Sequence, residues 1–103
     1  MTSNPHTSAI AVLRDEYAGD DAFLNLVDLL RPAWRQRSDR AQYVAAFGDV
    51  EIAIVLAGNM GQHAFEWFHE KIPALDQRSA ADVLQNEREG PRIIRSLLLR
   101  MPE

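Results

Sequence analysis

Apolar residues recur at helical spacing through most of the chain, with polar residues between them. The clearest apolar stripe near the start consists of Phe23, Leu26, Val27 and Leu30, and the clearest near the end consists of Ile93, Ile94, Leu97 and Leu98. Three- and four-residue steps of this kind are typical of amphipathic α-helices. The pattern predicts an all-α protein, a small single-domain bundle of about five to seven helices.

Capping residues and helix breakers divide the chain into these helices. Ser8 and Ser79 each precede an apolar run and can cap its helix, because a serine oxygen accepts a hydrogen bond from the first turn. Pro32 is expected to end the second helix, since proline disfavours helical geometry in the residue before it. Gly90-Pro91 is expected to open the last helix, with proline at its favoured first position.

Two interpretations stay open for residues 39–57. They form either one long helix, in which Gly48 costs about 1 kcal/mol relative to alanine, or two helices, with a break at Gly48 and a cap at Asp49. The run "IAIVL" also suits a buried strand by propensity. We reject the strand because no second run in the chain is suited to pair with it.

The chain has 103 residues, which fits one domain. The break "GNMG" divides it into an N-terminal helical region, residues 1–57, and a second region, residues 58–103, expected to pack as one domain. The absence of cysteine excludes disulfides and thiolate sites. The polar start has no secretory pattern, and no apolar run approaches the ~20 residues that span a bilayer. We therefore expect a cytoplasmic protein without membrane contact.

Catalytic chemistry finds no support in the residue pattern. His6 lies in a polar arm, and His63 and His69 lack the four-residue spacing of a helical metal pair. Paired carboxylates fall at predicted helix ends, where capping or solvation explains them. "GNMGQ" lacks the lysine of a phosphate-binding loop. We predict that the protein is not an enzyme and has no catalytic residues, no metal site and no cofactor.

An arginine cluster surrounds Trp34 and consists of Arg31, Arg35, Arg37 and Arg40. Arginines can contact phosphates and tryptophan can stack on a base, so the cluster is the candidate contact for DNA. The ordinary alternative is a solvated turn with Trp34 folded onto the core. The net charge of −4 argues against non-specific nucleic-acid binding by the whole chain.

The last third of the chain holds many apolar residues for its length. Leu97, Leu98 and Leu99 are consecutive and cover most of a helix circumference, and Met101 follows them. A helix that is apolar on most sides is buried on more than one side. We expect this region to expose apolar side chains that either a protein partner or a second copy of the chain covers.

Residues from about 58 to 101 resemble the toxin-binding domain of the Xre/MbcA/ParS antitoxin family. The resemblance lies in the order of several short pieces: Gly58-Asn59, Trp67-Phe68, Ile72-Pro73-Ala74-Leu75, "RSAADVL", Gly90 and "LLLRM". Asp76-Gln77 departs from the family pattern, which has a glycine-rich pair there, and Ala80 stands where proline is common. The first half corresponds to the family's helix-turn-helix-like region, in which we identify no recognition helix.

The resemblance implies a bacterial type II antitoxin that sterically blocks the NAD-consuming site of a RES-domain toxin. Its partner-binding residues are expected to be Trp67, Leu75, Leu99, Arg100 and Met101. We add Arg95, one turn before Arg100, because arginine suits a pocket for an anionic pyrophosphate. The alternatives are a DNA-binding transcriptional regulator and a homo-oligomeric helical protein without a toxin partner.

Overall fold

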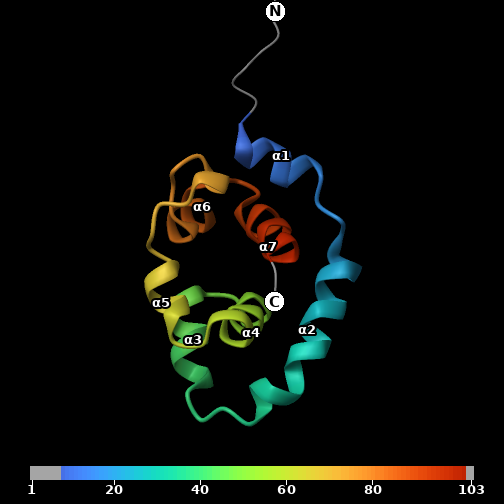
Figure 1. Ribbon diagram of the computed structural model, residues 1–103, viewed down its shortest axis with the longest axis vertical. Coiled ribbons are helices and arrows are strands. Elements are labelled where there is room, and N and C mark those ends of the chain that lie inside the picture. The colour runs from blue at the N-terminus through green and yellow to red at the C-terminus, as the bar shows by residue number, and fades with distance from the viewer. Residues whose placement is uncertain (1–7, 102–103) are drawn as a thin grey trace, which may run out of the picture.

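The computed structural model describes residues 8–101, and every regular element in that part of the chain is helical (Figure 1). The elements are α1 (Ala9–Asp15), α2 (Asp20–Arg35), α3 (Arg40–Phe47), α4 (Val50–Met60), α5 (His63–Trp67), a 3-10 turn η1 (Pro73–Leu75), α6 (Ala80–Asn86) and α7 (Gly90–Arg100). The predicted all-α bundle is confirmed. His6 lies outside the described residues.

Helix α4 is the most deeply buried element. Its residues from Ile52 to Ala57 are all buried, so the helix has apolar side chains all around its axis. A helix of this kind needs neighbours on several sides. Helices α2, α3 and α5 supply them, and Figure 1 shows α4 in the interior of the lower half of the molecule.

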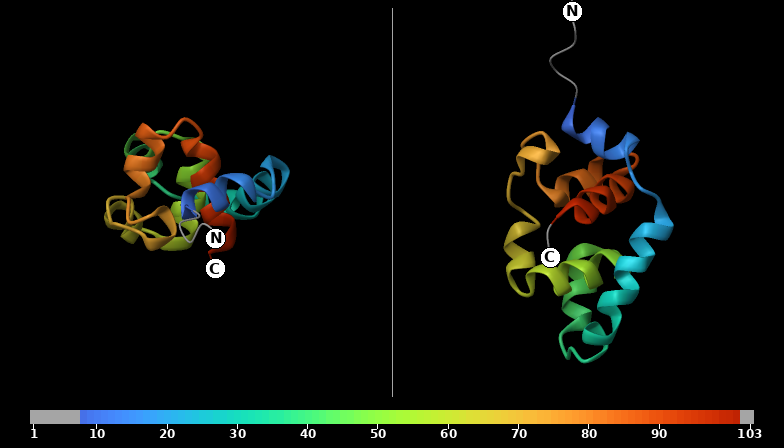
Figure 2. Two further views of the ribbon diagram at one scale, coloured as in Figure 1. Left: turned by 90° about the horizontal axis from the view of Figure 1, so that it is seen from above. Right: turned by 45° about the vertical axis from the view of Figure 1, so that its right-hand side comes forward.

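The upper half is built around α7. This helix packs against α1, α2 and α6, and α1 also contacts the turn η1 (Figures 1 and 2). Its inward side chains Ile93, Ile94 and Leu98 are almost fully buried. Because α2 contacts both α4 and α7, it joins the two halves along one edge of the molecule, and the buried residues form one continuous core.

Residues 39–57 form two helices, which answers the question that the sequence left open. Gly48 ends α3 in the left-handed region with a φ of 74°, a conformation that favours glycine. The Asp49 side chain then accepts a hydrogen bond of 3.0 Å from the Ile52 amide and caps α4. The rejected strand "IAIVL" lies within the buried part of α4.

The prediction that Pro32 ends the second helix is wrong. Helix α2 continues through Pro32 to Arg35. The proline is exposed, so the carbonyl that it leaves without an amide donor, that of Asp28, lies on the solvent side of the helix. Packing favours the continuation, because Trp34 is buried edge-on against Tyr43, with ring centroids 6.2 Å apart.

The predicted boundary at Gly58 also needs correction. Helix α4 runs through Gly58 to Met60, and the chain breaks at Gly61, which has a φ of 56°. Residues 58–60 therefore belong to the same helix as the end of the N-terminal region. The Gly90-Pro91 start of α7 and the Ser79 cap of α6 agree with prediction, the latter through a 3.0 Å bond from the Asp82 amide.

Candidate partner-binding surface

The end of α7 carries the predicted contact residues that reach solvent. Leu97 and Leu98 are buried, whereas Leu99 and Met101 are half-buried against the edge of the core. The Arg100 side chain is 44% exposed and donates a 3.4 Å hydrogen bond to Glu16. An exposed ion pair of this kind contributes little to stability. Arg100 is thus a cation beside two partly exposed apolar side chains, and little energy is needed to release it from Glu16.

Trp67 lies on α5, at the start of the segment that the resemblance covers. Its side chain is half-buried and packs against the core, while its neighbour Phe68 is buried with its ring centroid 4.7 Å from that of Phe47. Part of the Trp67 indole therefore reaches solvent and can contact a partner. The core position belongs to Phe68.

Leu75 is fully buried, which corrects its expected role as a partner contact. It lies in η1, inside a loop held closed by a hydrogen bond of 3.1 Å that the Ile72 amide donates to the Arg78 carbonyl. After it, Asp76 and Gln77 have φ values of 56° and 65°. Positive φ is uncommon for residues other than glycine. The pattern of the Xre/MbcA/ParS family has a glycine-rich pair at these two positions.

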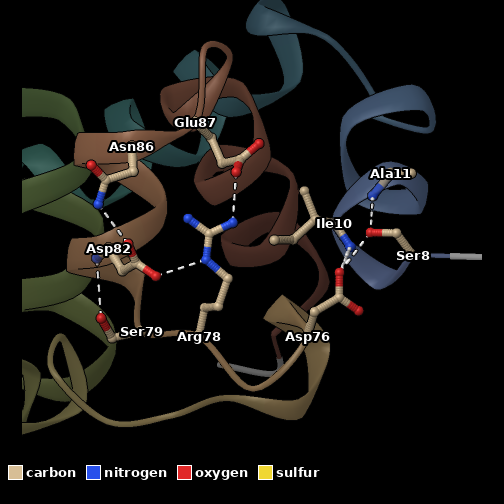
Figure 3. Close-up of polar contacts among 9 residues, drawn as sticks. All are labelled: Ser8, Ile10, Ala11, Asp76, Arg78, Ser79, Asp82, Asn86 and Glu87. Atoms are coloured by element: carbon tan, nitrogen blue, oxygen red, sulfur yellow. Dashed lines mark hydrogen bonds and ion pairs between the residues drawn. The ribbon is translucent and has the colours of Figure 1, made fainter.

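Asp76 ties this loop to the N-terminal helix (Figure 3). Its carboxylate accepts hydrogen bonds of 2.6 Å from the Ser8 hydroxyl, 2.9 Å from the Ala9 amide and 3.2 Å from the Ile10 amide. The Ser8 and Ala9 bonds hold the pKa of Asp76 below its usual value. The first turn of α1 is therefore capped twice, because the Ser8 hydroxyl also accepts from the Ala11 amide. Local sequence reasoning identified Ser8 and missed Asp76.

Arg78 fixes the other end of the loop. Its guanidinium donates a 2.7 Å bond to Asp82 on α6 and a 2.6 Å bond to Glu87 after α6 (Figure 3). These two carboxylates raise the pKa of Arg78. The hydrogen bonds that Arg78 and Asn86 donate to Asp82 lower the pKa of Asp82. The ion pairs brace α6 against the loop from Pro73 to Ser79.

Arg95 is held inside its own chain, so we reassign it from partner contact to structural link. Its side chain is only 17% exposed, and its Nη atoms lie 3.3 Å from Asp20, 3.5 Å from Asp49 and 3.0 Å from Glu51. The guanidinium also lies 5.0 Å from the centroid of the Phe23 ring. Burial alone lowers the pKa of Arg95, but Asp49, Tyr17 and Glu51 raise it overall. The residue joins α7 to the starts of α2 and α4.

The arginine cluster also differs from its expected form. Trp34 is 8% exposed and folds onto the core, so it has almost no face on which a base could stack. Arg37 donates hydrogen bonds to Asp39 and to the Tyr43 hydroxyl, and Arg31 lies 3.5 Å from Asp28. Arg35 and Arg40 remain exposed as the cations that phosphate could meet. The ordinary interpretation of Trp34 is thus the correct one.

A groove that the sequence did not indicate lies between the α3–α4 junction and α6. Its volume is about 360 Å³, near the lower end of the usual range for ligand pockets. The lining residues are Ala45, Ala46, Phe47, Gly48, Asp49, Phe68, Ala81, Leu84, Gln85 and Pro91. The lining is mainly apolar, and its one carboxylate, Asp49, already caps α4.

The expected excess of exposed apolar side chains in the last third is not observed. Within residues 8–101, the large apolar residues with the highest exposure are Leu29, at 76%, and Val50, at 49%, and both precede the segment that resembles the antitoxin domain. That segment offers only partly exposed apolar side chains, namely Met60, Phe65, Trp67, Ile72, Ala74, Leu84, Leu99 and Met101. Most of the leucines at its end are buried, because α7 packs against α1, α2 and α6.

Two further properties concern the described part of the chain. Residues 8–101 contain no group of three or more histidine, aspartate or glutamate side chains placed to hold a metal ion. Over the same residues, no single helix is long and apolar enough to cross a membrane. Helices α3 and α4 reach that length and apolar content only as a pair bent by 116°. Such a pair is weak support for a span, since α4 is the core helix.

Comparison with known proteins gives no family assignment. No family model, no curated protein and no solved structure matches this chain.

Proposed function

We propose that the chain is the antitoxin of a type II toxin-antitoxin system and that it neutralises an NAD-consuming RES-domain toxin by covering the toxin's NAD site. The proposal is supported by the order of elements after α4. Trp67-Phe68 ends α5, the Ile72–Leu75 piece forms the turn η1, Ser79 caps α6, and Gly90 opens α7. The pieces of the resemblance from Trp67 onward thus fall on α5, η1, α6 and α7 in the same order, with Gly90 at the start of α7 and "LLLRM" at its end.

The contact that we propose is the end of α7. Arg100 supplies a charge-assisted, planar donor for a site that holds an anionic pyrophosphate, and Leu99 and Met101 flank it with apolar surface. A few well-placed arginine and apolar contacts dominate the energy of many protein interfaces. Trp67 forms a second partly exposed contact. Leu75 and Arg95 act indirectly, by holding the loop and α7 in place.

The experiment measures NAD consumption by a purified RES-domain toxin as the chain is added. We expect consumption to fall to the background rate at stoichiometric amounts. The double variant Arg100→Glu with Met101→Asp should keep its helical circular-dichroism signal and lose the inhibition. Arg40→Glu is the matched control, because it reverses an exposed arginine on α3 and should inhibit like the unmodified chain.

Two results would count against the proposal. Undiminished NAD consumption with excess folded chain would contradict the proposal that a RES-domain toxin is the partner. Full inhibition by the double variant would leave a toxin partner but remove the end of α7 as its contact.

A further inference from the structure

We propose that the outward face of α2 is a self-association surface and that its occupant is α2 of a second copy of the chain, running antiparallel. The observation that draws attention to this face is Leu29, whose side chain is 76% exposed. Helix α2 lies along one long edge of the molecule (Figures 1 and 2). Its inner face buries Phe23, Val27 and Trp34 against the core. Leu29 lies on the opposite side of the helix.

Leu29 belongs to a second apolar stripe on this helix. Ala22, Leu26, Leu29 and Ala33 are separated by steps of four, three and four residues, which place them on one side of an α-helix. Ala33 is exposed, and Ala22 and Leu26 are half-buried; Leu26 lies between the two faces of the helix and also packs against the core. No charged residue occurs within the stripe. A two-residue apolar seam flanked by alanines allows a second helix to approach closely.

The stripe is symmetric about the middle of the helix. From either end it reads Ala, Leu, Leu, Ala, and its midpoint coincides with the midpoint of α2, Asp20–Arg35. In a two-fold dimer, a residue i that contacts j requires that j contacts i. An antiparallel copy therefore places Leu26 against the partner's Leu29 and Ala22 against the partner's Ala33. A stripe with this symmetry complements itself.

Charge favours the same orientation. The start of α2 carries Asp20 and Asp21, and its end carries Arg35. An antiparallel copy brings each acidic start beside a basic end, whereas a parallel copy brings like charges together. In the antiparallel pair, the positive end of each helix dipole also lies beside the negative end of the other, which is favourable. Asp28 points away from the stripe by helical spacing and lies 3.5 Å from Arg31 of its own chain, so it brings no negative charge into the seam.

The size of the surface sets the expected strength. A helix of this length is about 24 Å long at 1.5 Å per residue, and one helix pair buries less than the roughly 1,200–2,000 Å² of a stable interface. We therefore expect a dissociation constant on the order of 10–100 μM. The chain should be a monomer when dilute and a dimer when concentrated, which sedimentation equilibrium over that range measures directly.

Leu29→Asp should keep the circular-dichroism spectrum and stay monomeric throughout the range. Val50→Asp is the control, because Val50 is the other large apolar residue with high exposure and lies on α4. It should dimerise like the unmodified chain. Monomer at every concentration for the unmodified chain would overturn the proposal, and so would dimerisation of Leu29→Asp.

Cross-linking tests the orientation, and the chain is well suited to it because it contains no cysteine. We would mix two single variants, Ala22→Cys and Ala33→Cys, under mild oxidation. An antiparallel pair joins Cys of one variant to Cys of the other. Identical variants should not cross-link, because their thiols are then about 16 Å apart along the helix. Disulfides between identical variants, or none at all, would overturn the proposal. The result is independent of the toxin assay.

Discussion

Replacing Gly90 with alanine is expected to force α6 and α7 apart. A Cβ at this position would lie 2.5 Å from the carbonyl oxygen of Val83, 2.9 Å from the Cα of Leu84 and 3.2 Å from its carbonyl oxygen. All three atoms belong to the main chain of α6, so no side-chain rotation can relieve the contacts. Glycine is therefore required here by the close approach of two helices.

The magnitude follows from the cost of overpacking. An extra methyl group in a well-packed core typically costs 1–3 kcal/mol. Because main-chain atoms of α6 must move, we expect a loss of about 2–3 kcal/mol, a large fraction of the roughly 5–15 kcal/mol that stabilises a domain. For a domain of this size each kcal/mol lowers the melting temperature by about 4–8 °C. The variant should melt roughly 10–20 °C below the unmodified chain.

Urea unfolding followed by circular dichroism measures the effect, with Gly58→Ala as the matched control. A Cβ at Gly58 would meet only the side chain of Leu30, whose Cδ atoms lie 3.0 Å away and can shift. Gly58 also lies in the body of α4, where alanine is favoured over glycine by about 1 kcal/mol. We expect the control to unfold within about 1 kcal/mol of the unmodified chain. Equal unfolding midpoints for the two variants would refute the reasoning from backbone proximity.

Two further predictions concern the polar links. Arg95→Met should lower the free energy of unfolding by about 1–3 kcal/mol near pH 7, because Asp20, Asp49 and Glu51 then face one another unneutralised. A free energy of unfolding equal to that of the unmodified chain in the same urea assay would contradict the assignment. Asp76→Asn should destabilise the chain at pH 6, and the difference should disappear toward pH 2. The folded pKa of Asp76 is lowered, so its contribution is present above about pH 4 and is lost as the pH falls through that lowered value. A constant difference from pH 6 to pH 2 would show that the charge is not what stabilises α1.

Local signals in the sequence were sufficient for most helix starts. Ser8, Asp49 and Ser79 each accept a hydrogen bond from an amide three residues later, and Gly48 ends α3 with a positive φ. These are interactions within a single turn, so the sequence near each helix determines them. The helix count and the all-α class follow from the same short-range pattern.

Features that depend on distant parts of the chain were not predictable in this way. Pro32 was expected to stop α2, but burial of Trp34 against Tyr43 outweighs the local preference. Asp76 caps α1 across 66 to 68 positions of sequence, and Arg95 reaches Asp20 across 75. No spacing rule connects such pairs. Sequence patterns alone therefore predict Leu75 and Arg95 as partner contacts, although Leu75 is fully buried and Arg95 links helices of its own chain.

The same reasoning explains why the exposed apolar surface lies on α2 and not on α7. Leu97, Leu98 and Leu99 cover most of the circumference of α7, which indicated a missing partner, but α7 has three neighbours in its own chain, namely α1, α2 and α6. When apolar residues surround a helix, we can infer that the helix is buried on several sides. The pattern does not tell whether the neighbours on those sides belong to the same chain or to another molecule. Leu29 differs because it lies on an ordinary amphipathic helix whose core face is already complete without it. Leu26 of the second stripe also packs against the core, but Leu29 and Ala33 lie outside the core, so they are the stronger indication of an external partner.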